Sequence, residues 1–233
     1  MSKICVSLPA TSLQKLEFLI KNSLEISDFF EIRFDYLNKS EILTSMNTVE
    51  SIKSRSIFTL RSKKDRGYFS GSEMERIELL KFLFDSNPLY IDIELSTIRA
   101  DPSLFDYIKS DKKKLLLSWH DFENTPKDNE LEEKIEEMIS FTNTIKLVTM
   151  AKNSLDALRL LNLYHKFPNV NLISFAMGDA GILSRILCTL VGNAPFSYAS
   201  LETTTAPGQL SAKQMREIYD RIERHFSGNV HKC

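Results

Sequence analysis

The sequence predicts a single-domain α/β protein with the (β/α)8 TIM-barrel fold, and two observations support this. Short β-rich runs alternate with amphipathic stretches along the chain of 233 residues, and eight such runs are present. Strict alternation favours a parallel sheet with helical crossovers. An open doubly wound sheet is the alternative, but its first turn is usually glycine-rich, whereas the turn after Leu8 reads PATS. Eight units therefore favour a closed barrel at the compact end of its usual size.

Each predicted strand is a short aliphatic, aromatic or β-branched run that is followed by enough chain for a helix. In chain order the predicted strands are residues 3–8, 29–34, 56–60, 89–95, 115–119, 144–148, 170–175 and 195–199. We expect residues 1–226 to form one catalytic barrel domain and residues 227–233 to form a C-terminal tail.

Several connecting stretches carry their own helix-start signals. A Ser or Thr that precedes a Gln or Glu by three residues has the spacing of a capping box, in which two side chains satisfy unpaired backbone N–H groups. These pairs are Thr11 with Gln14, Ser72 with Glu75, and Ser211 with Gln214. Thr125 before Pro126 predicts one more helix start, because proline is well suited to the first helical position.

The composition excludes several classes of function. The formal net charge is −1, so the basic excess of nucleic-acid-binding domains is missing. The apolar stretch at the N-terminus is too short for a signal peptide. No apolar window approaches the ~20 residues of a membrane span. Cys5, Cys188 and Cys233 are too far apart for a disulfide framework or a zinc site. We expect a cytoplasmic protein with no nucleic-acid or membrane partner.

Ionisable residues interrupt five successive predicted strands at or near their C-terminal ends. Parallel strands that are buried on both faces are otherwise continuously apolar, and barrel active sites are built at this end of the strands. The interrupting residues are Glu31, Arg33, Asp35, Arg61, Asp92, Glu94, His120 and Lys146. Taken singly, each can be explained by a structural ion pair, but together they predict a polar binding site at one mouth of the barrel.

Lys146 and His120 are the candidate catalytic residues. A lysine inside a strand is poorly hydrated as an ammonium, and a lowered pKa would leave the free amine that attacks carbonyl groups. The alternative is a lysine paired with an acidic residue of a neighbouring strand. His120 lies at a strand end, where a general base is useful near neutral pH. We expect no metal, because no second histidine has ligand spacing, although Asp92, Glu94 and His120 are a minor alternative site.

The segments EIRFD, FTLRS, DIEL, SWHDF, TIKLVTMA, MGDAGILSR and TAPGQ resemble those of type I 3-dehydroquinate dehydratases in order and spacing. The resemblance extends from Cys5 to about Phe226. It implies a homodimeric enzyme without a cofactor that converts 3-dehydroquinate to 3-dehydroshikimate by syn elimination of water, in the shikimate pathway to aromatic amino acids. Lys146 resembles the lysine that forms a Schiff base with the substrate, and His120 resembles the acid–base residue.

The resemblance also implies which residues bind the substrate. Arg185 resembles the arginine that holds the substrate carboxylate, a role that suits a bidentate guanidinium. Gln209 resembles a contact in a loop after the last strand. The other residues that resemble substrate contacts are Glu31, Arg33, Arg61 and Thr205, with Ser7 as a weaker candidate.

The loop after the third predicted strand departs from the family pattern. The family usually reads R-x-x-x-E-G-G, and this chain has Asp65 in place of the glutamate that orients the histidine and Arg66 in place of a glycine. Asp65 is therefore a weaker site residue, because its shorter side chain does not reach as far. Two alternatives follow: another Schiff-base barrel, such as a class I aldolase that acts on a sugar phosphate, or a metabolite-binding barrel that has lost its chemistry.

Overall fold

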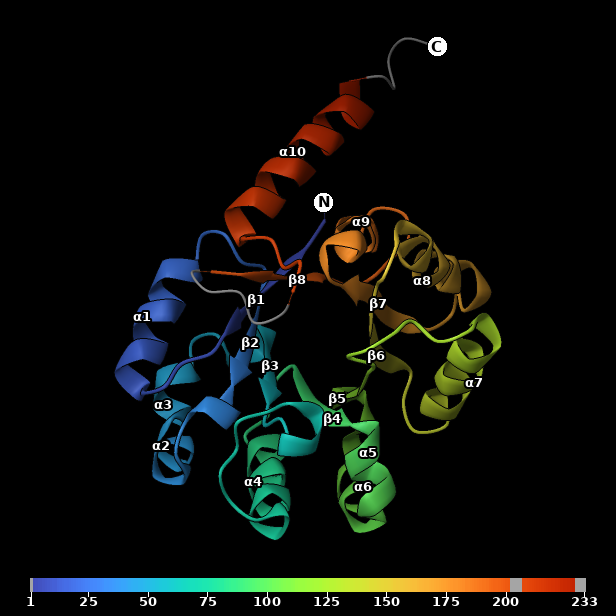
Figure 1. The fold of residues 1–233 in the computed structure, drawn as a ribbon. Coiled ribbons are helices and arrows are strands. Elements are labelled where there is room, and N and C mark those ends of the chain that lie inside the picture. The colour runs from blue at the N-terminus through green and yellow to red at the C-terminus, as the bar shows by residue number, and fades with distance from the viewer. Residues whose placement is uncertain (1, 202–206, 229–233) are drawn as a thin grey trace.

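The computed structural model describes residues 2–201 and 207–228, and within them eight parallel strands curve into a nearly closed barrel (Figure 1). The strands are β1 Ile4–Leu8, β2 Phe29–Arg33, β3 Ser56–Thr59, β4 Tyr90–Glu94, β5 Leu115–His120, β6 Thr144–Met150, β7 Asn171–Met177 and β8 Ser197–Ser200. Every predicted strand is present, with ends no more than two residues from the predicted ones.

The strand order confirms the barrel and excludes the open doubly wound sheet. Neighbours follow the order β7-β6-β5-β4-β3-β2-β1-β8, so that β1 pairs with both β2 and β8. Within the described residues β7 and β8 share no strand pairing, although they are next to each other around the ring in Figure 1. All strand pairs are parallel, which brings the carboxyl ends of the strands to the same mouth of the barrel.

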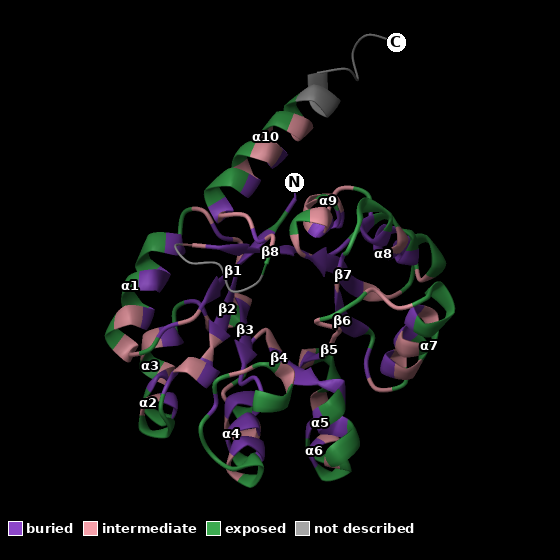
Figure 2. Cartoon of the chain, in the orientation of Figure 1, coloured by how far each residue is buried: buried purple, intermediate pink, exposed green. Residues whose placement is uncertain are grey.

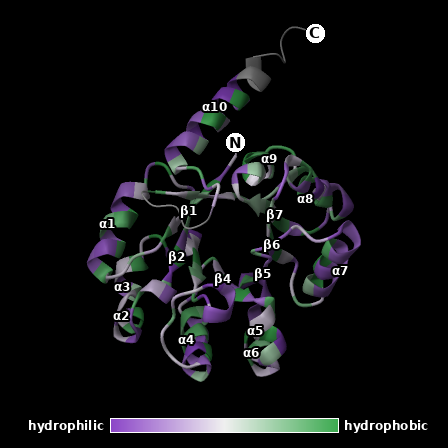
Figure 3. Cartoon of the chain, viewed as in Figure 1, coloured by the Kyte–Doolittle hydropathy of each residue, from purple (hydrophilic) through white to green (hydrophobic). Residues whose placement is uncertain are grey.

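The helices surround the strands, and α10 extends beyond the ring (Figure 1). They are α1 Leu13–Ser23, α2 Lys39–Thr44, α3 Met46–Val49, α4 Glu73–Asp85, α5 Leu95–Ala100, α6 Pro102–Ile108, α7 Asp128–Ile139, α8 Ser154–Lys166, α9 Ile182–Leu187 and α10 Ala212–Gly228. Figure 2 shows buried strands at the centre and exposed outer helix faces, and in Figure 3 the helices alternate between hydrophilic and hydrophobic segments. The core therefore lies between the barrel wall and the apolar faces of the helices.

Two of the predicted capping boxes are confirmed. The Ser72 side chain accepts a hydrogen bond from the Glu75 backbone N–H, and the Glu75 side chain accepts one from the Ser72 backbone. Ser211 and Gln214 make the same reciprocal bonds, at 3.2 and 3.0 Å. Helices α4 and α10 therefore begin where the sequence predicts.

Two other predicted helix starts are wrong. Ser12, and not Thr11, caps α1 and accepts the backbone hydrogen bond of its first turn. Helix α7 begins only at Asp128 and has no side-chain cap. The hydroxyl of Thr125 is instead 2.7 Å from the hydroxyl of Thr149, so the segment before α7 is bound to β6 and is not available as a cap.

Three further findings concern membrane spans, the cysteines and the domain boundary. Among the helices of residues 2–201 and 207–228, none combines the length and the apolar character that a membrane span requires. Cys5 and Cys188 are free thiols, and both are buried. Helix α10 continues past the domain boundary predicted at residue 226, and residues 229–233 of the predicted tail lie outside the described residues, so the boundary stays a prediction.

Candidate active site

A cavity of about 280 Å³ opens at the mouth of the barrel where the strands end. Its polar wall contains eight of the residues that the sequence predicts for the site. These are Glu31, Arg33, Arg61, Asp65, His120, Lys146, Arg185 and Gln209. Val148, Met150, Phe175 and Met177 also line the cavity, and a mainly apolar lining with a few polar groups is typical of a small-molecule site.

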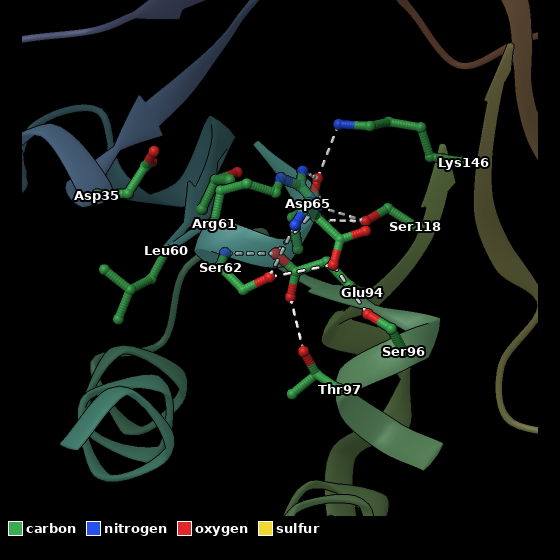
Figure 4. A network of polar contacts seen from close by, with 12 residues as sticks. Asp35, Leu60, Arg61, Ser62, Asp65, Glu94, Ser96, Thr97, Ser118 and Lys146 are labelled. Carbon is green, nitrogen blue, oxygen red and sulfur yellow. Dashed lines mark hydrogen bonds and ion pairs between the residues drawn. The ribbon is translucent and has the colours of Figure 1, made fainter. Parts of the chain in front are cut away.

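Lys146 lies inside β6, and its side chain is only 5% exposed. Its Nζ is 2.7 Å from Asp92 Oδ2, 3.4 Å from Glu31 Oε1 and 3.3 Å from the Tyr198 hydroxyl. Figure 4 shows the lysine extending toward the polar network around Arg61. The ion pair that the sequence left open as an alternative is therefore present. A covalent role for Lys146 therefore requires that its amine leave this ion pair when substrate binds.

Asp92 is the centre of this network. Its Oδ2 accepts hydrogen bonds from Lys146 and, at 2.8 Å, from Arg61, and its Oδ1 accepts one from Ser118 at 2.6 Å. Burial alone would raise the pKa of Asp92, but the charges of Arg61 and Lys146 outweigh it and hold the pKa well below its usual range. Asp92 is therefore an anion that pairs with two cations, Arg61 and Lys146.

Glu94 lies two residues further along β4 and has a different task. It accepts hydrogen bonds from the Ser62 backbone N–H at 3.0 Å, from Arg76 at 3.2 Å and from Thr97 at 2.9 Å (Figure 4). It also lies 3.3 Å from Arg61 Nη1. Glu94 therefore anchors the loop that follows β3.

His120 is the last residue of β5 and borders the cavity. Burial lowers the pKa of His120 well below 6.5, and the positive charges of Arg61 and Lys146 lower it further. Its Nδ1 atom is buried and has no hydrogen-bond partner among the described residues. The strand register places Ser118 beside Lys146 and His120 beside Val148. The neutral imidazole of His120 therefore lies on the strand beside Lys146, two residues nearer the mouth of the barrel.

Arg185 lies in α9 and is only 1% exposed. Its guanidinium lies over the ring of Phe175 at 4.3 Å, and Nη1 donates to the Tyr198 carbonyl at 3.3 Å. Nε and Nη2 are buried without a hydrogen-bond partner within the described residues. Burial lowers the pKa of Arg185 to about 10, so it stays cationic at neutral pH. A buried cation with two unsatisfied donors is suited to bind an anion.

The rim next to β2 is built from Arg33 and two tyrosines. Arg33 binds both carboxylate oxygens of Asp35, at 2.8 and 2.7 Å, so Asp35 and not Glu31 is its ion-pair partner. The Tyr68 backbone N–H donates to Asp35 at 3.1 Å, and the rings of Tyr36 and Tyr68 lie 4.5 Å apart. This arrangement orients Arg33 toward the cavity and places aromatic side chains at its entrance.

Glu31 is held from behind by Ser7. The Ser7 hydroxyl donates to Glu31 Oε2 at 2.6 Å, and Thr59 donates to Oε1 at 3.3 Å. Burial would raise the pKa of Glu31, but Lys146 and Arg33 lower it overall. Ser7 is not among the residues that line the cavity, so its contact with the site runs through Glu31.

A sequence model of the type I 3-dehydroquinase family matches residues 4–225. The chain belongs to this family. A 3-dehydroquinate dehydratase from Dehalococcoides mccartyi is 37% identical over 217 residues, which are 91% of this chain and 93% of that protein. One from Lactococcus lactis is 36% identical over 230 residues, 96% of this chain and 99% of that protein. The crystal structure of the Aquifex aeolicus 3-dehydroquinate dehydratase is 28% identical with a TM-score of 0.76, covering 96% of this chain and 100% of that chain.

The loop that departs from the type I 3-dehydroquinase pattern does not place Asp65 against His120. The Asp65 carboxylate instead accepts hydrogen bonds from Ser62 Oγ at 3.0 Å and Ser96 Oγ at 2.9 Å. Arg66 has a left-handed backbone, with φ 59° and ψ 31°, a conformation that glycine adopts most easily. Asp65 therefore stabilises the loop through Ser62 and Ser96. Within the described residues no carboxylate hydrogen-bonds to His120.

Gln209 and Thr205 are the predicted site residues that follow the last strand. Gln209 is buried and lines the cavity beside Pro207, as predicted for a loop after the last strand. Thr205 lies outside the described residues, so its role stays a prediction.

The sequence did not single out two residues that the structure brings to the site. Tyr198 in β8 contacts Lys146 through both its hydroxyl and its ring, at 3.3 Å and 4.4 Å. Phe122, just after β5, lies against the ring of His120. In the sequence both are aromatic residues near a strand, which core packing explains equally well. The described residues contain no cluster of His, Cys, Asp and Glu side chains that could hold a metal ion.

Proposed function

We propose that this protein is a 3-dehydroquinate dehydratase of the shikimate pathway that acts through a Schiff base on Lys146. Membership of the type I 3-dehydroquinase family and relatives with that activity in their names support the dehydration, and the enzyme is accordingly a hydro-lyase. The observation that carries the covalent route is the position of Lys146. It is a buried primary amine on the cavity wall, and a neutral histidine lies on the neighbouring strand, two residues beyond the residue that pairs with Lys146.

The proposed chemistry begins with Lys146. Its Nζ, after loss of a proton, attacks the ring ketone, and water leaves to give a protonated imine. The imine withdraws electrons from the neighbouring carbon, and His120 removes a proton from that carbon. The electrons of the broken C–H bond form an enamine, which expels the hydroxyl from the next carbon as His120 returns its proton to it. Hydrolysis of the imine then releases 3-dehydroshikimate and restores the lysine.

The strand register supports this division of labour. Lys146 on β6 lies beside Ser118 on β5. His120 is two residues beyond Ser118 on β5, and its side chain is on the same face. Two residues of a strand rise by about 6.5 Å, so a six-membered ring attached to Lys146 would extend toward the imidazole. One histidine that both removes and returns the proton acts on a single face of the ring, which corresponds to syn elimination.

The remaining polar groups would bind and orient the substrate. We propose that Arg185 binds the carboxylate, because its two unsatisfied donors can form a bidentate contact. Glu31, Arg33, Arg61 and Gln209 would contact ring hydroxyls or hold the catalytic pair, and Thr205 is proposed from the resemblance alone. Ser7 would act by holding Glu31.

Two parts of the assignment rest on the sequence alone. We propose a homodimer that acts in the cytoplasm, from the resemblance and from the isolated cysteines. The aldolase and non-catalytic alternatives are set aside, because the family match covers residues 4–225 and the cavity presents a buried cation suited to a carboxylate.

The test of the activity is direct. Purified protein is mixed with 3-dehydroquinate, and ultraviolet absorbance of the conjugated product is recorded. We expect turnover by the unmodified protein, none by Lys146→Ala, and a large decrease for His120→Ala. Positioned acid–base help is typically worth about 10²–10⁴-fold. No absorbance change, while a known dehydratase is active in the same assay, would contradict the proposed function.

A further inference from the structure

Three side chains at the rim of the cavity form a cluster that contains the proposed base. The rings of His120 and Phe122 lie 5.5 Å apart and nearly parallel, with 8° between their planes. The guanidinium carbon of Arg66 lies 4.4 Å from the centroid of the Phe122 ring. All three side chains line the cavity. We call His120, Phe122 and Arg66 the ring cluster.

The backbone of Arg66 is set by a tight turn. The Arg66 N–H donates to the Lys63 carbonyl at 3.2 Å, and the Gly67 N–H donates to the Ser62 carbonyl at 2.7 Å. A Cβ on Gly67 would lie 2.1 Å from the Arg61 carbonyl oxygen, so a residue larger than glycine does not fit there without moving the loop. Arg66 itself has a positive φ, which disfavours a side chain relative to glycine. Its contact with Phe122 offsets part of that cost.

Phe122 is held separately by its own loop. The Asp121 N–H donates to the Val148 carbonyl at 2.9 Å, which binds the loop to β6. The Asp121 carboxylate accepts the backbone N–H groups of Glu123 at 2.9 Å and Asn124 at 2.8 Å. The backbone on both sides of Phe122 is therefore held in place, and Arg66 contacts the Phe122 ring from a different loop.

The imidazole of His120 has no such anchor through a hydrogen bond. Its Nδ1 has no partner among the described residues, and the Asp65 carboxylate is bonded to Ser62 and Ser96. A ring without a bonded nitrogen can turn about its side-chain torsions unless packing prevents it. We propose that Phe122 and Arg66 are positioning residues that set the plane of His120 by ring contact, in place of a carboxylate. This inference rests on the proposed role of His120 as the base.

The ring cluster predicts a specific kinetic pattern. Phe122→Leu removes the ring contact and should lower kcat by up to about ten-fold, and Arg66→Gly should lower it about two- to five-fold. KM should change little, because neither residue is proposed to bind the substrate. Phe122→Tyr and Arg66→Lys keep the ring and the cation and should retain most of kcat. Lys63→Ala, which removes a cation from the same turn, is the matched control and should leave kcat unchanged.

A second background separates positioning from a general structural effect. In His120→Ala protein, Phe122→Leu should have no further effect on kcat, because the group that it positions is gone. The proposal is overturned if Phe122→Leu lowers kcat by the same factor in both backgrounds, or if it leaves kcat unchanged when His120 is present. Thermal unfolding of each variant establishes that it is folded.

A measurement without substrate keeps this test distinct from that of the proposed function. The imidazole proton signals of His120 in an NMR spectrum should be displaced by the ring current of Phe122, and Phe122→Leu should remove the displacement. Unchanged signals in Phe122→Leu would overturn the ring cluster even in an active enzyme. An inactive wild-type protein whose His120 signals do shift would refute the proposed function and leave the contact established.

Discussion

Replacing Arg185 with methionine is expected to weaken substrate binding and at the same time to stabilise the free protein. Arg185 is 1% exposed, and two of its guanidinium nitrogens have no hydrogen-bond partner within the described residues. A buried cation of this kind costs free energy in the absence of an anion. Methionine fills a similar volume without a charge and can keep a contact with the ring of Phe175.

The two effects have different magnitudes. Loss of one member of a buried, hydrogen-bonded charge pair costs about 2–5 kcal/mol in binding, which corresponds to an increase in KM from about 30-fold to several thousand-fold. Unsatisfied buried donors cost about 1–3 kcal/mol, and the Arg185→Met protein avoids this cost. For a domain of this size each kcal/mol changes Tm by about 2–4 °C, so Tm should rise by several degrees.

Initial rates from the absorbance assay give KM, and thermal unfolding without substrate gives Tm. Arg76→Met is the matched control, because Arg76 is equally buried at 1% but is bound to Glu73, Glu94 and Thr97. Breaking that buried network should lower stability by about 3–5 kcal/mol. An Arg185→Met protein with unchanged KM, or one that loses as much stability as Arg76→Met, would refute the reasoning.

Three other predictions follow from the site and the fold. Burial and the charges of Arg61 and Lys146 lower the pKa of His120, so its imidazole stays neutral at acidic pH. The acid limb of the pH profile of kcat/KM should therefore lie below pH 6.5. A His120-dependent limb at or above pH 6.5 contradicts this prediction. Gly67→Ala should lower the free energy of unfolding by about 1–3 kcal/mol, because its Cβ would meet backbone at 2.1 Å, and an unchanged denaturant midpoint would be evidence against the tight turn. Ser72→Ala removes the N-cap of α4 and should lower the free energy of unfolding, measured by thermal unfolding, by about 1 kcal/mol with kcat unchanged. A change in kcat would show that α4 acts on the site.

The strands and the mouth of the barrel could be predicted because their signals are local. An apolar run with a charged residue near its end identifies both a strand and the end at which the site lies, as Arg33 and His120 show. Parity along the strand then gives the face of the barrel on which a side chain lies. The family pattern added Arg185 and Gln209, which lie on helices or loops where no periodicity marks them.

The choice of partners could not be predicted, because it depends on contacts between segments that are far apart in the chain. Asp92 and Glu94 have the same parity, yet one contacts Lys146 and the other anchors the loop after β3. Arg33 is two residues from both Glu31 and Asp35, and only the turn after β2 decides that it pairs with Asp35. The helix start predicted at Thr125 failed for the same reason, because β6 binds its hydroxyl.

Borohydride reduction in the presence of 3-dehydroquinate, followed by mass spectrometry of the peptides, is the most direct test of the covalent mechanism. We expect one adduct, on Lys146, and none in Lys146→Ala protein treated in the same way. An enzyme that turns over 3-dehydroquinate without an adduct, or with the adduct on another lysine, would mean that Lys146 forms no Schiff base and that the mechanism is wrong.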